Sequence, residues 1–426
     1  MASGAGTPSR VAGFVPFRTT RLLLAALLLA LAGCGSTEIK PPRAPEDSTD
    51  ARAAGAVTAL KRLATGLAER DRSSVVALAA PDQESRAAVT ALYANAGALR
   101  LRDLGFRYVD EEPGAVDDRA ARRYGDRAWS ASVTGTWRVG GFDDGRTHVP
   151  TRFTFAQTGD GVRIVSAGGG GERGGLWLEG PVKVARAGDS MVVTAGGDPA
   201  RYARLAAQAV TDVREVLRSW RGSLVVEVPS SQAQLERVLG AEKGEYSAIA
   251  AVTTTVDGSL AADSPVHVFV NPKVFDGLGA KGSQVVLSHE ATHVATDASF
   301  ASMPTWLLEG FADFVALDHA DIPLRTAASQ ILRRVREKGA PTGLPTAQDL
   351  DPTAQALGAT YEEAWTACRY LAQRYGEATM VAFYRAVADG LSTRAAFRRV
   401  VGTNQQVFVR DWSRDLVRLA GGQGGA

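Results

Sequence analysis

The stretch GSQVVLSHEATHVA, residues 282–295, contains two of the five histidines of this chain. His289 and His293 are four positions apart, and Glu290 directly follows the first of them. Positions i and i+4 lie on one face of an α-helix, one turn apart, so two imidazoles at this spacing can reach one metal ion at about 2.0–2.1 Å each. Apolar residues one turn earlier predict that this face is buried. We therefore expect a buried helix that carries half of a metal site.

A third metal ligand is expected, because a catalytic zinc usually has three protein ligands and one open position. The metzincin pattern would require glycine and histidine at positions 296 and 299, where Thr296 and Ser299 stand, and this excludes that class. Asp297, four residues after His293, is one possible ligand.

A better ligand follows in MPTWLLEGFADFVA, residues 303–316. Proline is favoured at the first position of a helix, so Pro304 predicts a helix start. Glu309 and Asp313 are one turn apart on this predicted helix. This spacing provides one carboxylate for the metal and a second carboxylate that can orient a ligand histidine. Gly310 costs about 1 kcal/mol relative to alanine inside a helix, which predicts that two helices of the site approach each other closely there.

The pattern H-E-x-x-H followed by W-x-x-E-G-x-A-D resembles the gluzincin zinc metallopeptidases, and most closely their peptidase-MA-like bacterial branch. The resemblance covers about residues 200–420. It implies Zn²⁺ as the cofactor and His289, His293 and Glu309 as its ligands. It also implies that Glu290 is the general base that activates a water molecule, and that Asp313 is the outer partner of a ligand histidine, His289.

Tyr361 opens the predicted helix ATYEEAWTACRYLAQRYG, residues 359–376. This phrase is similar to the tyrosine-led helix of aminopeptidase-type gluzincins, which implies that the phenol of Tyr361 stabilises the oxyanion of the reaction. A packing role is the alternative for a tyrosine at a helix start. Cys368 in the same helix is predicted to be a buried small hydrophobic residue.

The three remaining histidines have no metal spacing to a partner. His148, in a β-rich segment, and His319, which follows the Glu309 helix, are predicted to be surface or structural residues. His267 is on the predicted strand VHVFVNP, and the sequence assigns it no role.

The first 33 residues have the pattern of a secretory signal peptide, because three arginines precede an apolar run at 22–31 that is too short to span a bilayer. The run ends in Leu-Ala-Gly followed by Cys34, which resembles the lipobox of bacterial lipoproteins. The resemblance implies that Cys34 is lipidated and anchors the protein to the extracytoplasmic face of the bacterial cell membrane. An ordinary signal peptide is the alternative. Residues 34–50 are rich in proline and charge and predict a tether.

The charge of the chain gives no support for a nucleic-acid partner, and its cysteine content argues against an intrachain disulfide. Removal of the signal segment takes away three arginines and changes the formal charge from +2 to −1, so the mature chain has no basic run that would favour a nucleic-acid partner. The chain has two cysteines, and lipidation of Cys34 leaves Cys368 without a partner for an intrachain disulfide.

The order of predicted elements indicates an α+β fold in two units. Residues 51–167 predict an accessory domain in which two amphipathic helices precede four β-rich runs, an order similar to the cystatin-like or nuclear-transport-factor-like cone. The glycine-rich segment 168–176 lacks the lysine of a phosphate loop and predicts a flexible linker. Residues 177–421 predict a gluzincin-like domain with a long helix at 199–220, a small sheet, the H-E-x-x-H helix and a C-terminal helical lobe.

These features together predict a membrane-anchored, extracytoplasmic, zinc-dependent peptidase that hydrolyses peptide bonds of a peptide or protein substrate. The alternative is a non-catalytic binding or scaffold lipoprotein with a vestigial or structural metal site. Glu290 favours catalysis, because a structural zinc site needs ligands but no base.

Overall fold

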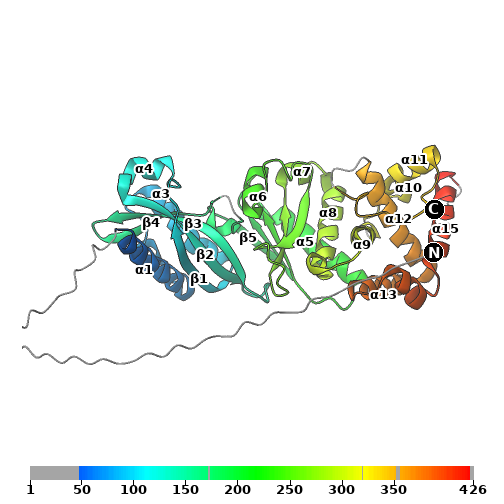
Figure 1. The fold of residues 1–426 in the computed structure, drawn as a ribbon, viewed down its shortest axis with the longest axis horizontal. Coiled ribbons are helices and arrows are strands. Elements are labelled where there is room, and N and C mark those ends of the chain that lie inside the picture. The colour runs from blue at the N-terminus through cyan, green and yellow to red at the C-terminus, as the bar shows by residue number, and fades with distance from the viewer. Residues whose placement is uncertain (1–47, 171–172, 319, 352–355, 423–426) are drawn as a thin grey trace, which may run out of the picture. The chain divides into compact units, whose positions relative to one another are not determined.

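The computed structural model describes residues 48–170, 173–318, 320–351 and 356–422 (Figure 1). Within these ranges the protein is an α+β fold with about half of its residues in helices and with two small sheets, which confirms the predicted fold class at this level. The predicted signal peptide, Cys34, most of the tether and His319 lie outside the described residues. No helix in the described ranges is both long and apolar enough to cross a bilayer.

The first sheet is antiparallel, with strands in chain order, and two long helices pack against it. Its strands follow the predicted β-rich runs closely because buried and partly exposed residues alternate along them, most clearly in the second strand. The strands are β1 (Leu101–Glu111), β2 (Ala128–Val139), β3 (Thr147–Thr158) and β4 (Gly161–Ala167), and the helices are α1 (Ser48–Glu69) and α3 (Gln83–Ala98).

Two short helices in this part were not predicted, α2 (Arg72–Val76) and α4 (Asp118–Tyr124). Each begins after an aspartate, Asp71 or Asp117, whose carboxylate accepts a hydrogen bond from a backbone N–H of the first turn. The cap was visible in the sequence, but a helix of five to seven residues is too short for a periodic apolar pattern to mark it. The short turn η1 (Gly125–Arg127) follows α4.

The second sheet has the strand order β5-β6-β7-β9-β8, in which the three central strands are parallel and both edge strands are antiparallel to their neighbours. The helix α5 (Pro199–Val216) packs on this sheet and ends four residues earlier than predicted, at the C-cap Leu217. The strands are β5 (Lys183–Ala187), β6 (Ser190–Thr194), β7 (Leu224–Val228), β8 (Ala251–Thr255) and β9 (Val266–Val270), and the short helices are α6 (Gln232–Leu239) and α7 (Pro272–Phe275).

The described part of the glycine-rich linker is packed rather than free. The Gly168 N–H donates to Arg152 O at 2.9 Å and the Gly174 N–H donates to Val238 O at 3.0 Å. The turn η2 (Leu176–Leu178) that follows is fully buried, with Trp177 set edge-on against Trp137 at 5.4 Å between ring centroids. The hydrophobic core of the first sheet continues through this turn onto one face of the second sheet.

The remainder of the described chain is helical, as the pattern predicted. The helix α8 (Gly279–Ala295) runs beside the edge strand β8, and α9 (Thr305–Asp318) contacts α8, α5 and α12. Figure 1 shows the last helices, drawn yellow to red, gathered in one lobe. They are α10 (Leu324–Ala327), α11 (Ser329–Lys338), α12 (Leu357–Tyr375), α13 (Glu377–Ala388), α14 (Thr393–Ala396), the π-helical segment η4 (Phe397–Val401) and α15 (Gln405–Ala420). The short turn η3 (Ala298–Phe300) lies between α8 and α9.

A buried charged cluster joins the β2–β3 connection to the second sheet. His267 Nδ1 lies 2.7 Å from Glu227 Oε1, and His267 Nε2 lies 3.0 Å from Asp143 Oδ1. Ionised carboxylates only accept hydrogen bonds, so beside two of them both ring nitrogens donate and the imidazole is protonated. Burial alone would lower the pKa of His267, but the carboxylates of Asp143 and Glu227 outweigh it and raise this pKa to about 10. The histidine without an assigned role therefore serves as a buried cation of the fold.

Candidate metal centre

Helices α8 and α9 bring together the three residues predicted to hold a metal. His289 Nε2 and His293 Nε2 lie 3.0 Å apart, and Glu309 Oε2 lies 3.3 Å from the first of these nitrogens and 3.7 Å from the second. One ligand atom from each residue lies within 4.8 Å of the others. Each of the three side chains is mostly buried.

This geometry fits a tetrahedral zinc ion. Zinc bonds of about 2.0–2.1 Å separate neighbouring ligand atoms by roughly 3.3 Å, close to the three distances between the Nε2 atoms and the carboxylate oxygen. The two Nε2 atoms also face each other, an arrangement in which a shared cation can accept both lone pairs. The donor set of two imidazoles and one carboxylate is that of a catalytic rather than a structural zinc site.

Asp313 lies behind His289, on the same face of α9 as Glu309. Its Oδ1 is 2.7 Å from His289 Nδ1, so the carboxylate holds a proton on Nδ1, and Nε2 is the nitrogen directed at the centre, where a metal ion would replace the second proton of the imidazolium. Burial lowers the pKa of His289, but the carboxylates of Asp313 and Glu309 outweigh it and hold that pKa well above its usual value. The Nδ1 atom of His293 has no hydrogen-bond partner among the described residues.

Glu309 is ionised at neutral pH. Burial opposes its charge, but hydrogen bonds from His289 and His293 and their electrostatic attraction hold the pKa of its carboxyl far below the usual range. The site therefore offers a permanent negative charge to a cation.

Asp297, the other possible third ligand, does not join the group. It follows the end of α8 with a φ of 50°, in the left-handed region. This turn takes the chain out of the helix before the aspartate can extend the ligand face of α8.

Glu290 lies beside the group but is not one of its three members. Its buried carboxylate accepts a hydrogen bond from Thr253 on β8, with 2.7 Å between Thr253 Oγ1 and Glu290 Oε2. The same hydroxyl lies 3.1 Å from the backbone oxygen of Glu290. Thr253 was not identified from the sequence, because it is 37 residues away on a strand and belongs to no motif.

Tyr361 lies on α12, which begins at Leu357, so this tyrosine is one turn inside the helix and does not open it as predicted. Burial raises the pKa of its phenol, and the charges of Glu309, Asp313 and Glu290 raise it further. The phenol is therefore protonated and can donate a hydrogen bond.

Gly310 allows α9 to contact α12 closely. A Cβ atom at this position would lie 2.5 Å from the backbone oxygen of Ala364 and 3.1 Å from Cys368 Sγ. The predicted close approach is thus confirmed, and it fixes the distance between the helix of Glu309 and the helix of Tyr361. Cys368 is completely buried, as predicted.

Two further groups support α8 and were missed by sequence reasoning. Behind the helix, Ser288 Oγ donates to Asp212 Oδ2 on α5 at 2.6 Å. At its end, the Tyr384 hydroxyl donates to Thr296 Oγ1 at 3.1 Å, and the Tyr384 ring stacks on Phe311 at 4.3 Å between centroids. Burial raises the pKa of Tyr384 to about 12. These contacts connect helices far apart in the chain, and no local pattern indicates them.

His148 is exposed, and its ring lies 3.2 Å from Thr136 Oγ1, which fits the predicted surface role.

In comparisons with known proteins, no family model matches this chain and no curated protein matches its sequence. The case for the site therefore depends on its residues and their geometry.

Proposed function

We propose that this protein is a zinc-dependent peptidase of the gluzincin type. The observation that carries the proposal is the convergence of His289, His293 and Glu309, with ligand atoms within 4.8 Å of one another, beside a carboxylate at Glu290 that is left for proton transfer. Zn²⁺ held by these three residues would supply a Lewis acid.

The residues of the chain have separate roles in this proposal. Glu290 accepts a proton from the attacking water and delivers it to the leaving amine of the peptide. Thr253 holds the carboxylate of Glu290 in place, and Tyr361 donates a hydrogen bond to the oxygen of the scissile carbonyl as negative charge develops there. Asp313 keeps His289 in the tautomer that binds metal.

A peptide or protein substrate fits the position of β8. This strand is at the edge of the second sheet and pairs only with β9 among the described strands. An extended peptide can add to such an edge through backbone hydrogen bonds. Because Thr253 of β8 contacts Glu290, a peptide on this edge would pass beside the base.

The location of the protein is part of the same proposal. Lipidation of Cys34 would hold the peptidase at the extracytoplasmic face of a bacterial membrane, with residues 34–50 as the tether. The first sheet with α1 and α3 would be a cystatin-like or nuclear-transport-factor-like accessory domain.

Peptide-library cleavage by the zinc-loaded protein, with and without a chelator, tests the proposal. We expect about one zinc per chain, cleavage products in the loaded sample and none after chelation. A zinc-loaded protein that cleaves nothing in the library would favour the scaffold lipoprotein instead.

Substitution of Glu309 by alanine is expected to weaken zinc binding by more than about 100-fold, since loss of an outer-shell partner alone costs about 10–100-fold. Competition with a chromophoric chelator measures the affinity. The matched control is Asp297→Ala, which removes the other residue considered as a third ligand and should leave zinc affinity unchanged. Weaker zinc binding in Asp297→Ala together with unchanged binding in Glu309→Ala would assign the third ligand to Asp297.

Substitution of Tyr361 by phenylalanine is expected to lower kcat about 10²-fold and to leave KM within about twofold, because a donor to a developing oxyanion acts in the transition state. Steady-state cleavage of a single peptide measures both constants. Tyr370→Phe is the control on the same helix, where the ring packs against Phe408 at 5.7 Å. Equal kcat values for the two variants would remove Tyr361 from the mechanism.

A further inference from the structure

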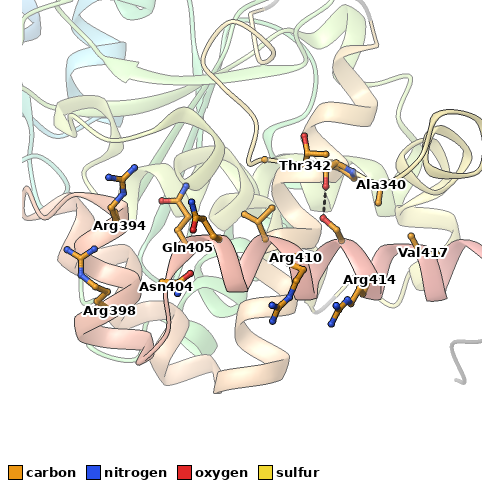
Figure 2. Close-up of a pocket in the computed structure, with 14 residues that line it drawn as sticks. Ala340, Thr342, Arg394, Arg398, Asn404, Gln405, Arg410, Arg414 and Val417 are labelled. Atoms are coloured by element: carbon orange, nitrogen blue, oxygen red, sulfur yellow. Dashed lines mark hydrogen bonds between the residues drawn. The ribbon is translucent and has the colours of Figure 1, made fainter.

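A concave site separate from the metal centre lies on the C-terminal lobe. It is a groove of about 1000 Å³ between α15, the α14–η4 segment and the loop 340–343 (Figure 2). None of the residues of the candidate metal centre lines it. We propose that this groove binds an acidic peptide segment, and this inference does not depend on the peptidase proposal.

The charged residues that line the groove are all positive. Of the fourteen residues of the described chain that line it, four are arginines and none is acidic. Arg394 and Arg398 are exposed, one turn apart, and have no acidic partner within the described residues. Arg410 and Arg414 share the single carboxylate of Asp411, at N–O distances of 2.9 and 3.6 Å. Four guanidinium groups that pair with one carboxylate among the described residues leave a positive potential that an anionic ligand would neutralise.

The shape of the groove favours a peptide over a membrane surface. Lining residues extend along α15 from Gln405 to Val417, about 18 Å at 1.5 Å per residue, which is the length of roughly five or six residues of extended peptide. A flat bilayer cannot enter such a concave site, whereas an extended chain can lie in it. Figure 2 shows arginines near both ends of this length, Arg394 and Arg398 at one and Arg410 and Arg414 towards the other.

The uncharged lining also suits a peptide. Gln405 and Gln406 place side-chain amides at the first turn of α15, and such amides can both donate to peptide C=O groups and accept from peptide N–H groups. The N-cap Asn404 uses its side-chain oxygen to accept the Val407 N–H at 2.9 Å, so its NH₂ group is the part that can donate to a peptide. The partial positive charge of this helix N-terminus adds to the attraction for carboxylates. Val409 and Val417, the latter 53 % exposed, provide apolar contact for side chains between the acidic ones.

One hydrogen bond shapes the groove before any ligand arrives. Ser413 Oγ donates to Pro341 O at 2.5 Å and holds the loop 340–343 against α15, as the dashed line in Figure 2 marks. The wall is therefore fixed, and ligand binding does not have to order it.

Fluorescence anisotropy tests this inference with the full-length chain in a nonionic detergent. The probe is a labelled octapeptide of alternating glutamate and alanine, and its neutral control carries glutamine in place of glutamate. We expect the acidic peptide to bind at least tenfold more tightly than the neutral one. Each of the double variants Arg394→Gln/Arg398→Gln and Arg410→Gln/Arg414→Gln should weaken its binding about tenfold.

The matched control is Arg62→Gln/Arg204→Gln, which removes two exposed arginines of α1 and α5 and the same net charge. It should change affinity less than twofold. Equal affinity for both peptides, or equal loss in the control and groove variants, would overturn the inference. Soluble short-chain phosphatidylglycerol and inorganic phosphate are added as competitors. Displacement of the probe by either at a concentration below that of the unlabelled peptide would assign the groove to a lipid headgroup or to phosphate and exclude the peptide.

Discussion

Replacement of Glu290 by glutamine is expected to lower kcat for peptide hydrolysis by about 10²–10⁴-fold, the range of a general acid–base group, while zinc stays bound. The amide has nearly the shape of the carboxylate, so it can keep the hydrogen bond from Thr253 Oγ1, which is 2.7 Å long in the parent protein. It cannot accept the proton of the attacking water. Steady-state cleavage and the zinc content of the same preparation measure the two halves of the prediction.

Two variants at Thr253 serve as controls for this result. Thr253→Ser keeps the hydroxyl that contacts Glu290 and should retain kcat within about threefold, whereas Thr253→Val removes the hydroxyl and should lower kcat by about tenfold, with zinc affinity unchanged in both. A Glu290→Gln protein that cleaves as fast as the parent would remove Glu290 from the mechanism. Loss of both zinc and activity would instead indicate that Glu290 supports the metal site.

The local part of this fold and site could be predicted from the sequence. Alternation of buried and exposed residues gave the strands of the first sheet to within about two residues, because a strand pattern depends on nearest neighbours. The spacing of His289 and His293, and of Glu309 and Asp313, gave pairs on one helix face for the same reason. A short-range pattern can state which residues share a face.

The contacts that complete the site join residues far apart in the chain, and no short-range pattern contains them. Thr253 is 37 residues from Glu290, and Tyr384 is 88 residues from Thr296. Each pair meets because a helix packs on a strand or on another helix, and the meeting point depends on the whole core. Tyr361 shows the same limit on a smaller scale, since its helix begins one turn earlier than predicted.

The metal centre and the His267 cluster use related groups in opposite ways. At the centre, Asp313 fixes one nitrogen of His289 and leaves the other directed at Glu309 and His293. In the cluster, the two nitrogens of His267 face two separate carboxylates, and the group does not bring three ligand atoms together as the metal centre does. The convergence of three ligand atoms, rather than the presence of histidine beside acids, therefore separates a candidate metal ligand from a structural cation.

Replacement of His267 by leucine is expected to reduce the free energy of unfolding by about 3–5 kcal/mol, the usual effect of removing one partner from a buried ion pair. Asp143 and Glu227 would then be buried without their shared cation. Denaturant unfolding at pH 7 measures the loss. His148→Leu is the matched control, because that histidine is exposed in the first sheet, and it should change stability by less than about 0.5 kcal/mol.

The pH dependence of the same pair of proteins gives a second, independent measurement. The pKa of His267 is about 10 in the folded protein and about 6.5 in the unfolded chain, so the stabilisation by the imidazolium is complete below pH 6.5 and is lost as pH rises through 10. The stability difference between the parent and His267→Leu should therefore narrow between pH 7 and pH 10.5, while the difference for His148→Leu stays constant. Adding Glu227→Gln to His267→Leu should recover part of the lost stability, because one uncompensated buried charge is removed. A constant difference across this pH range, with no recovery in the double variant, would mean that His267 is neutral and contributes only packing.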